Sequence, residues 1–335
     1  MGVQKDEKEW LRRLNGNKSP KNGNSSIESE NKGASQSPSA MTQAKCEAKK
    51  NVCGFKDVAG MDELKMLVVE GFINVLNNRE CAEAFGIVPP SLLFYGPAGC
   101  GKTFFAEAVA SEVGVNFMKV VPDDIASKWV HGTQEKIGEI FRKAERTAPT
   151  VLFFDEFDAM VPHRTEDDRH NQNGEVNEFL CMLNNASEKG VYVIAATNHP
   201  EAIDKAVLRT GRIDEMIYVD LPDAKARESL FRLSLAKYPV AEDVDYEKLA
   251  DLTTGYNCSD ISYIVKVALR KSFNASIAEK DKPYKCVTQI QLEEIISHKS
   301  PSITAKDLRE YERVRSEFSP KDEGVKRIRI GFQNN

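Results

Sequence analysis

Gly96-Pro97-Ala98-Gly99-Cys100-Gly101-Lys102-Thr103 is the stretch that decides the fold of this 335-residue chain. It fits G-x-x-x-x-G-K-[ST], the phosphate-binding P-loop. The apolar residues 91–95 before it predict a buried strand, and residues 104–113 after it predict a helix. Backbone N–H groups of such a loop, together with the helix N-terminus, attract phosphate oxygens. We therefore expect Lys102 to reach the β- and γ-phosphates of a nucleotide and the Thr103 hydroxyl to bind Mg2+.

Composition restricts the class of protein. The net charge of -5 argues against a dedicated nucleic-acid binder, which usually has a concentrated basic excess. The seven cysteines are dispersed, with no C-x-x-C pair or H-E-x-x-H metal spacing, so we expect reduced thiols and a cytoplasmic location. No apolar run is long enough to cross a bilayer and no signal-peptide pattern occurs, so no membrane partner is expected.

Four segments are expected along the chain. Residues 1–53 hold 10 Lys and Arg against 6 Asp and Glu and have few aliphatic residues, which predicts a disordered polar tail. Residues 54–222 alternate apolar runs with helical patterns, which predicts an α/β domain built on a three-layer parallel sheet. Residues 223–320 carry helical patterns and predict a small all-helical domain, and residues 321–335 form a C-terminal tail. Within the first tail, residues 5–14 either form a transient helix or dock a partner.

Five apolar runs are expected to form the parallel sheet: residues 91–95, 116–121, 151–155, 191–196 and 216–219. They are β-branched or aromatic and nearly continuous, as is typical of strands that are buried on both faces. Helices of the second domain are expected at residues 224–237, 245–252, 259–278, 288–296 and 304–317. Ser259 and Thr304 are the expected N-caps of two of them.

Polar side chains stand at the ends of two of these strands. If the strand that ends in Asp155 lies next to the P-loop strand, Asp155 comes to lie beside Thr103 and holds Mg2+ through water. Glu156 is then placed to orient or deprotonate the attacking water. Asn198, at the end of another strand, is expected to hydrogen-bond the attacking water or the γ-phosphate. Taken alone, an Asn in such a place is more often a turn former.

Two arginines follow this last strand at a spacing of three residues. Arg209 and Arg212 are expected to stabilise negative charge as the γ-phosphoryl group departs. The alternative is a pair of solvated surface arginines.

Together these residues resemble the AAA+ ATPases, in particular the AAA subfamily and its valosin-containing and katanin/spastin-like branches with a single ATPase module. The resemblance covers Gly54 to Phe318. It implies a P-loop three-layer parallel sheet followed by a small helical lid, with ATP and Mg2+ as ligands. It also implies that Arg209 and Arg212 act on the nucleotide of a neighbouring subunit in a homo-oligomeric ring, usually a hexamer.

The resemblance extends the expected nucleotide site beyond the P-loop. Asp57, Val58 and Gly60 would lie against the adenine, and Cys258 and Ser259 of the lid would border it. These residues join the P-loop and the residue after it: Gly96, Pro97, Ala98, Gly99, Cys100, Gly101, Lys102, Thr103 and Phe104.

The expected route of substrate follows from the same resemblance. Trp129 and Val130 fall where the family carries a central-pore loop that grips an extended polypeptide, since a large aromatic can pack on any side chain. A tryptophan packed in the core is the alternative. Residues 165–174 match a second pore loop or a plain surface loop equally well.

The sequence departs from the family pattern at several places. His131 and Cys258 each replace an expected Gly, His199 stands where Arg is common, and residues 183–186 replace M-D-G-[FL]. None of these changes removes a phosphate or metal contact. The favoured function is an ATP-hydrolysing ring that unfolds, extracts or disassembles a protein substrate, delivered directly or by an adaptor. The alternatives are a nucleic-acid motor or loader and a non-hydrolysing switch.

Cys100 carries a separate prediction. A thiol at a helix N-terminus beside Lys102 is expected to have a lowered pKa, so that its oxidation or alkylation blocks ATP binding. The alternative is an inert small residue.

Overall fold

The computed structural model describes residues 54–126, 132–163, 172–184, 186–209, 211–279 and 284–318. They all belong to one compact unit, Lys50–Asn335. Both predicted tails lie outside the described residues, as do the pore-loop residues Trp129 and Val130 and most of residues 165–174. Those assignments stay predictions.

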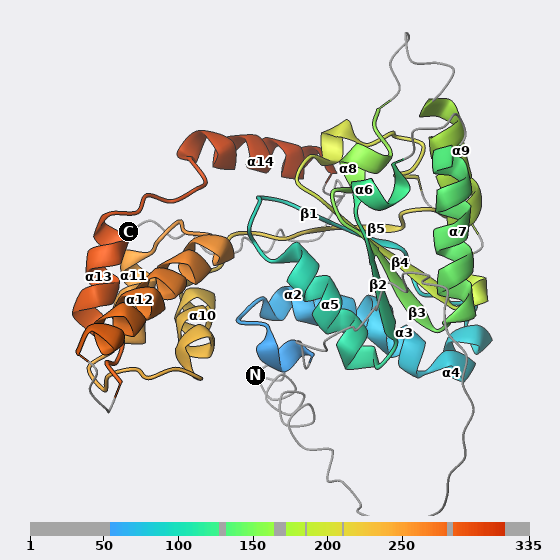
Figure 1. The fold of residues 1–335 in the computed structure, drawn as a ribbon. Helices are drawn as coiled ribbons and strands as arrows, with labels where there is room; N and C mark the ends of the chain where they lie inside the picture. Colours follow the sequence, from blue (N-terminus) through green and yellow to red (C-terminus); the bar gives the residue numbers. More distant parts are fainter. Residues whose placement is uncertain are drawn as a thin grey trace, which may run out of the picture. The chain divides into compact units, whose positions relative to one another are not determined.

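A five-stranded parallel sheet forms the centre of the first half of this unit (Figure 1). Its strands are β1 (Leu92–Tyr95), β2 (Asn116–Val120), β3 (Thr150–Phe154), β4 (Val191–Thr197) and β5 (Glu215–Tyr218). Their spatial order is β2-β3-β4-β1-β5. All five predicted strands are confirmed, because a run that is apolar on both faces is stable only inside a covered sheet.

Helices cover both faces of the sheet. They are η1 (Phe55–Asp57), α2 (Asp62–Val68), η2 (Val69–Ile73), α3 (Asn74–Asn77), α4 (Arg79–Ala84), α5 (Lys102–Val113), α6 (Pro122–Ile125), α7 (Gly132–Arg146), α8 (Phe157–Met160), α9 (Gln172–Leu183), η3 (Ser187–Lys189) and η4 (Pro200–Ala202). Side chains of each strand alternate between two apolar clusters: Phe94 packs with Phe105 of α5 on one face, and Leu93 lies in the cluster that contains Phe141 of α7. The three-layer α/β prediction is confirmed.

A helical region with its own core follows the sheet. Helices α10 (Ala224–Leu235), α11 (Tyr246–Leu252), α12 (Cys258–Glu279) and α13 (Gln289–Ser297) bury a third cluster that includes Phe231, Leu249, Ile261 and Leu292. We call these four helices the lid. The change from sheet to helices falls at Asp223, whose side chain caps α10. The exact domain boundaries stay predictions.

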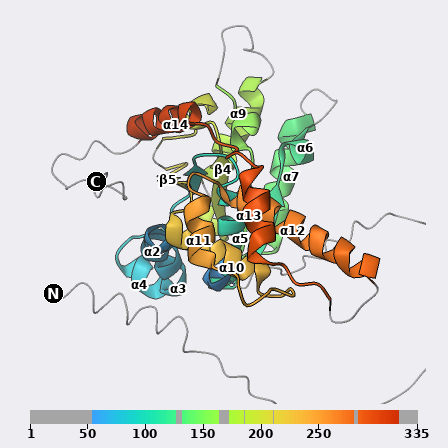
Figure 2. The same ribbon diagram turned by 90° about the vertical axis from the view of Figure 1, so that its left-hand side faces the viewer.

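The last described helix, α14 (Ala305–Phe318), leaves the lid and lies against the first domain (Figures 1 and 2). The Arg315 guanidinium stacks 4.7 Å from the Tyr218 ring at the end of β5, and the Phe318 ring meets Tyr95 of β1 at 6.2 Å. The final helix of the helical region therefore packs on the sheet domain as well.

Two local predictions need correction and one is confirmed. Helix α12 begins at Cys258 and is capped by Asn257, not by Ser259, because the Asn257 side chain accepts a hydrogen bond of 2.8 Å from the Asp260 N–H. Helix α9 begins at Gln172, so the end of the predicted loop at residues 165–174 is helical. Thr304 caps α14 as expected, in a reciprocal pair with Asp307.

Within the described ranges, none of the helices has both the length and the apolar composition that a bilayer span requires.

Candidate active site at the P-loop

The P-loop leaves β1 and enters α5 through glycines in left-handed conformations. Gly99 has φ 75° and Gly101 has φ 90°, conformations that cost other residues about 1–2 kcal/mol. A Cβ at Gly101 would meet no atom within 4 Å, so the loop backbone is open to approach on that side. Gly101 is also the N-cap of α5, where the first N–H groups lack partners in the helix. This is the arrangement that a phosphate group needs.

Lys102 is the first residue of α5, and its ammonium group is folded over the loop. It donates to the carbonyl oxygens of Gly96 (2.9 Å) and Pro97 (2.8 Å) and to Oδ1 of Asn198 (2.7 Å). Only 8% of the residue is exposed, and burial lowers the pKa of its ammonium to about 8. A buried ammonium with a lowered pKa gains more than a solvated one when phosphate oxygens approach, because its attraction is less screened.

Asp155 lies beside Thr103, as the sequence predicts. The Thr103 hydroxyl donates to Asp155 Oδ2 at 3.0 Å, and Oδ1 accepts from the Glu156 N–H at 3.2 Å. Glu156 itself adopts a left-handed conformation with φ 52°, and the residue is exposed at the start of α8. A non-glycine residue in this conformation is uncommon and is often found at functional sites.

The route by which Asp155 reaches the P-loop differs from the prediction. Strand β3, which ends at Phe154 just before Asp155, is not the neighbour of β1, because β4 lies between them. The contact forms because Thr103 belongs to α5, and this helix packs against both β3 and β4. Strand β4 carries Asn198 just past its end. The Asn198 amide therefore lies between the P-loop and Asp155, which the sequence predicts as separate features.

A polar chain behind Asn198 was not predicted from the sequence. The Thr197 hydroxyl donates to Asp158 Oδ1 at 2.5 Å and accepts from the His199 N–H at 2.9 Å. Thr197 is only 1% exposed, so these bonds fix the backbone on both sides of Asn198. No motif marks them, because Asp158 and Thr197 are 39 residues apart and meet only in the folded sheet.

The residues present fit a magnesium–nucleotide complex. Hydroxyl and carboxylate oxygens are the ligands that Mg2+ prefers, and Thr103 and Asp155 already present one of each at 3.0 Å from each other. Among the described residues no group of three or more His, Cys, Asp or Glu side chains is arranged to hold a metal ion. An ion at this place would therefore take most of its ligands from phosphate oxygens and water.

Arg209 and Arg212 lie apart from the groups around Lys102. Arg209 is exposed, and Arg212 is half-buried with its guanidinium donating to the Ala206 carbonyl oxygen at 2.6 Å. No contact in the described residues joins either side chain to the P-loop. Their expected role in a neighbouring subunit stays a prediction.

The segment expected against the adenine forms η1 and the turn that follows it. Phe55 stacks on Phe105 of α5 at 5.6 Å, and the Val58 carbonyl oxygen accepts a hydrogen bond of 2.8 Å from Lys65. At Gly60, a Cβ would lie 2.5 Å from the Cβ of Ala226 in the lid, so only glycine allows this approach. Phe104, by contrast, is 41% exposed on α5.

The lid meets the P-loop through one short segment, residues 257–259. The Asn257 amide donates to the Ala98 carbonyl oxygen at 3.0 Å, and the Ser259 N–H donates to that of Gly99 at 3.1 Å. The Cys258 thiol lies 3.6 Å from the carbonyl oxygen of Cys100. A Cβ at Gly99 would lie 2.7 Å from the Asn257 amide nitrogen, so this glycine also makes room for the lid. We call residues 257–259 the lid contact segment.

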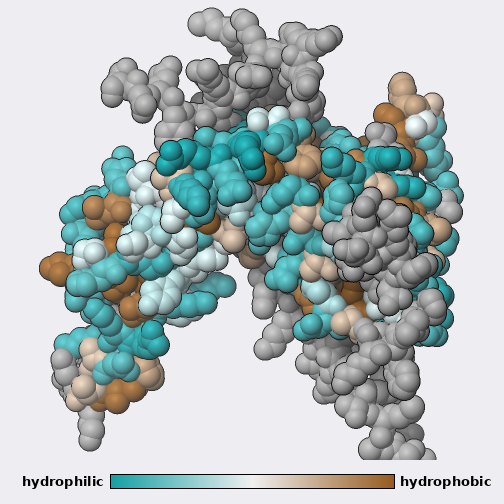
Figure 3. All heavy atoms as spheres, turned by 90° about the horizontal axis from the view of Figure 1, so that it is seen from above, coloured by the Kyte–Doolittle hydropathy of each residue, from teal (hydrophilic) through white to brown (hydrophobic). Residues whose placement is uncertain are grey.

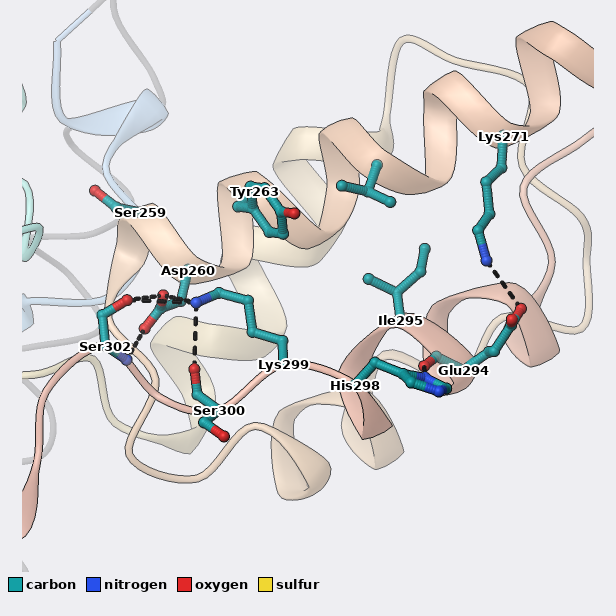
Figure 4. Close-up of a pocket in the computed structure, with 11 residues that line it drawn as sticks. Ser259, Asp260, Tyr263, Lys271, Glu294, Ile295, His298, Lys299, Ser300 and Ser302 are labelled. Carbon is teal, nitrogen blue, oxygen red and sulfur yellow. Dashed lines mark hydrogen bonds and ion pairs between the residues drawn. The ribbon is translucent and has the colours of Figure 1, made fainter.

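A buried carboxylate holds the lid contact segment in place (Figure 4). Asp260 is 3% exposed and pairs with the Lys299 ammonium at 2.6 Å, and Oδ2 accepts from the Ser302 N–H at 3.0 Å. Burial alone would raise the pKa of Asp260, but the hydrogen bonds from Lys299 and Ser302 outweigh it and hold the pKa below its usual value. The hollow of about 710 Å³ beside this cluster, between α12 and α13, therefore presents an acid that is already fully paired.

The prediction for Cys100 is wrong in its direction. Cys100 is fully buried, and burial raises the pKa of its thiol to about 12, with Cys258 adding to the effect and Lys102 only partly opposing it. The neighbouring lysine is outweighed because the low-polarity surroundings disfavour any thiolate.

Seen from above, the described residues present a largely hydrophilic surface with scattered apolar side chains (Figure 3). A glycine-rich loop at a helix N-terminus, a buried lysine and a carboxylate–threonine pair at the carboxyl ends of the strands define a P-loop nucleoside triphosphatase.

Comparison with known proteins gives the family. Residues 92–221 match the family described as "ATPase family associated with various cellular activities (AAA)". Over 293 residues the chain is 37% identical to the Cell division cycle protein 48 homolog of Archaeoglobus fulgidus. The match covers 84% of this chain and 40% of that relative, so the chain spans well under half the length of the curated protein that it matches. The chain therefore carries an ATPase domain of the AAA family.

Proposed function

We propose that this protein hydrolyses ATP with Mg2+ at the P-loop and uses the energy to remodel a protein substrate. The observation that carries the proposal is the cluster of Lys102, Thr103, Asp155 and Asn198 at one edge of the sheet, joined by hydrogen bonds of 2.7–3.0 Å. Binding, metal and water-orienting groups of the types that phosphoryl transfer needs are thus side by side.

Each side chain has a part in this proposal. Lys102 exchanges its carbonyl partners for phosphate oxygens. Thr103 and Asp155 would hold the Mg2+, which would supply positive charge to the phosphate when bound. Glu156, exposed next to Asp155, orients the attacking water and accepts its proton. Asn198 holds the water or the γ-phosphate in line. Asp57, Val58, Gly60, Phe104, Cys258 and Ser259 enclose the nucleoside, together with P-loop residues 96–101.

The remaining parts of the proposal concern assembly and substrate. Arg209 and Arg212, which make no contact with their own P-loop among the described residues, complete the site of a neighbouring copy in a homo-oligomeric ring, usually a hexamer. Trp129 and Val130 then grip a polypeptide in the central pore and move it as nucleotide turns over. The 37% identity to the Cell division cycle protein 48 homolog of Archaeoglobus fulgidus supports an activity of this kind. A cytoplasmic location fits the free thiols of the described cysteines.

Two variants separate hydrolysis from remodelling. Glu156→Gln should bind ATP with unchanged affinity but lower the rate of phosphate release about 100- to 10,000-fold, since a positioned general base contributes that much. Trp129→Ala should keep the basal rate of phosphate release and lose its stimulation by an unfolded polypeptide such as casein. Phosphate release is measured with and without casein, and affinity with a fluorescent ATP analogue.

Glu188→Gln is the matched control, because this exposed carboxyl lies in η3 at the opposite end of β4. It should behave as wild type. Full phosphate release by Glu156→Gln would contradict the hydrolytic assignment. Normal casein stimulation of Trp129→Ala would contradict the threading part alone. A steep salt dependence of DNA binding would instead favour a nucleic-acid motor.

A further inference from the structure

Lys119 of β2 makes a contact at the P-loop edge that none of the site's expected roles includes. Its ammonium lies 2.7 Å from Oδ2 of Asp155, and 42% of the lysine side chain and 23% of the aspartate side chain are exposed. The register brings the two together, because β2 pairs with β3 and the Asp155 N–H donates to the Val120 carbonyl oxygen at 3.0 Å. The pair is therefore built into the sheet.

The contact falls on the oxygen that also faces Thr103. Asp155 Oδ2 accepts from both the Lys119 ammonium and the Thr103 hydroxyl, while Oδ1 accepts from the Glu156 N–H. The carboxylate that would hold the water shell of Mg2+ thus already has a cationic partner. A metal ion that binds at this place must share the carboxylate with an ammonium group a few ångströms away.

The charges around Asp155 favour nucleotide over free metal. The Asp155 carboxylate has a second lysine within electrostatic reach, since its charge acts on the Lys102 ammonium. Lys119 is bonded directly to the metal-binding carboxylate, Lys102 is influenced by the charges of both Asp155 and Asp158, and the described residues offer no group of three acids or histidines arranged to hold an ion. A divalent cation alone must therefore compete with the Lys119 ammonium for Asp155, whereas a triphosphate brings negative charge and its own metal ligands.

We propose that Lys119 is a positioning residue that couples metal binding to nucleotide binding by occupying Asp155 until a nucleoside triphosphate supplies negative charge. The inference rests on the proposed function, because it concerns the Mg2+ of the same site. It differs from a simple surface ion pair in one measurable respect: removal of the Lys119 charge must change the affinity for Mg2+.

The test uses Lys119→Met, which keeps the length of the side chain and removes its charge. A non-hydrolysable fluorescent ATP analogue is bound to the full chain, and Mg2+ is added. The Mg2+ concentration that gives half of the maximal fluorescence change should be about tenfold lower than for wild type. This is the size expected when one charge a few ångströms away is removed in a partly solvated site. Analogue affinity in EDTA should stay within about twofold of wild type, because Lys119 is assigned to Asp155 and not to phosphate.

Two further variants keep the result interpretable. Lys119→Arg retains the charge and should behave as wild type. Lys189→Met removes a lysine from an ion pair of similar exposure, Lys189 with Glu145 at 2.8 Å, and should leave the Mg2+ dependence unchanged. If Lys119→Met does not fold, as seen by thermal unfolding, Lys119→Gln takes its place with the same expected shift.

An unchanged Mg2+ requirement in Lys119→Met or Lys119→Gln would overturn the inference. A loss of analogue affinity in EDTA would also overturn it, because Lys119 would then be a phosphate ligand. These outcomes are distinct from a failure of the proposed function, in which the wild-type protein itself would show no Mg2+-dependent nucleotide binding.

Discussion

The P-loop and the lid contact segment contribute to the proposed nucleotide site in different ways. The P-loop offers charged and polar groups, since the Lys102 ammonium donates to Asn198 and the Thr103 hydroxyl donates to Asp155. The lid contact segment contributes close packing, because its residues donate hydrogen bonds to carbonyl oxygens of the loop. They also approach the loop at Gly99, where a larger residue would clash. Substitutions in the first region should therefore change nucleotide affinity directly, whereas those in the second should act first on stability.

The largest effect is expected at Lys102. Lys102→Met removes the only buried lysine found among the described residues, and charge-assisted bonds to phosphate of this kind contribute about 1.5–3 kcal/mol each, so affinity for ATP should fall about 100-fold or more. Lys271→Met, which removes an exposed lysine paired with Glu294 in the lid, should leave the affinity unchanged. Binding of a fluorescent ATP analogue measures both.

The same variant has a pH signature in the absence of nucleotide. The folded pKa of Lys102 is about 8 and its usual value is 10.5, so the unfolded state binds more protons between these pH values. The free energy of unfolding of the wild type should therefore rise as pH increases from about 8 to 10.5, and Lys102→Met should lack this rise. The free energy of unfolding is measured by denaturant titration at each pH. If it changes with pH equally in wild type and Lys102→Met, burial does not lower the pKa of Lys102.

The two regions also differ in how far the sequence predicts them. The P-loop, Asp155 and the five strands follow from local residue types, since apolar runs and glycine spacing act within a few residues. The contact between Lys119 and Asp155 cannot be predicted in this way. A lysine within a strand shows no partner until the register of β2 on β3 is known. The sequence predicts that β1 and β3 end at the same edge of the sheet, but it does not show that β4 lies between them.

Burial explains why the prediction for Cys100 was wrong. For Cys100 the sequence shows a helix N-terminus and a lysine, both of which lower a thiol pKa. It does not show that the lid and the sheet exclude water from the same atom. Tertiary burial is set by residues such as Cys258, 158 positions away, and no local pattern reports it.

A smaller effect is expected at Asp260. Asp260→Ala leaves Lys299 without its partner and removes the bonds to Ser302, which should lower the free energy of unfolding by about 3 kcal/mol. Affinity for ATP should fall less than tenfold, because the Asp260 carboxylate reaches the lid contact segment through one bond, which it accepts from the Asn257 N–H at 3.4 Å, while the bond from the Asp260 N–H to Asn257 Oδ1 remains in the variant. Urea titrations and analogue binding measure the two effects.

The pH dependence of this variant gives a second measurement. The folded pKa of Asp260 is lowered, so its contribution is present above the unfolded value of about 4 and is lost as pH falls through the folded pKa. The difference between wild type and Asp260→Ala should therefore shrink in acid. A variant that loses affinity as strongly as Lys102→Met while keeping its stability would break the distinction between the two regions.

The smallest effect on ATP binding is expected from thiol modification, because Cys100 and Cys258 are protected where the two regions meet. Burial raises their pKa values to about 12 and about 11, so N-ethylmaleimide should modify the exposed cysteines Cys81, Cys181 and Cys286 at least about 100-fold faster. Peptide mass spectrometry over time gives each rate, and ATP binding should persist while only the exposed thiols are modified.

The Asp260→Ala variant turns this measurement into a test of the lid. Because the Cys258 side chain lies against the Cys100 backbone, loosening the lid contact segment should expose both thiols and raise their modification rates together. Acceleration of Cys258 alone would mean that the P-loop buries Cys100 without help from the lid. Rapid modification of Cys100 in the wild type would support the low thiol pKa that its neighbours in sequence suggest. It would also mean that the lid is away from the loop for much of the time.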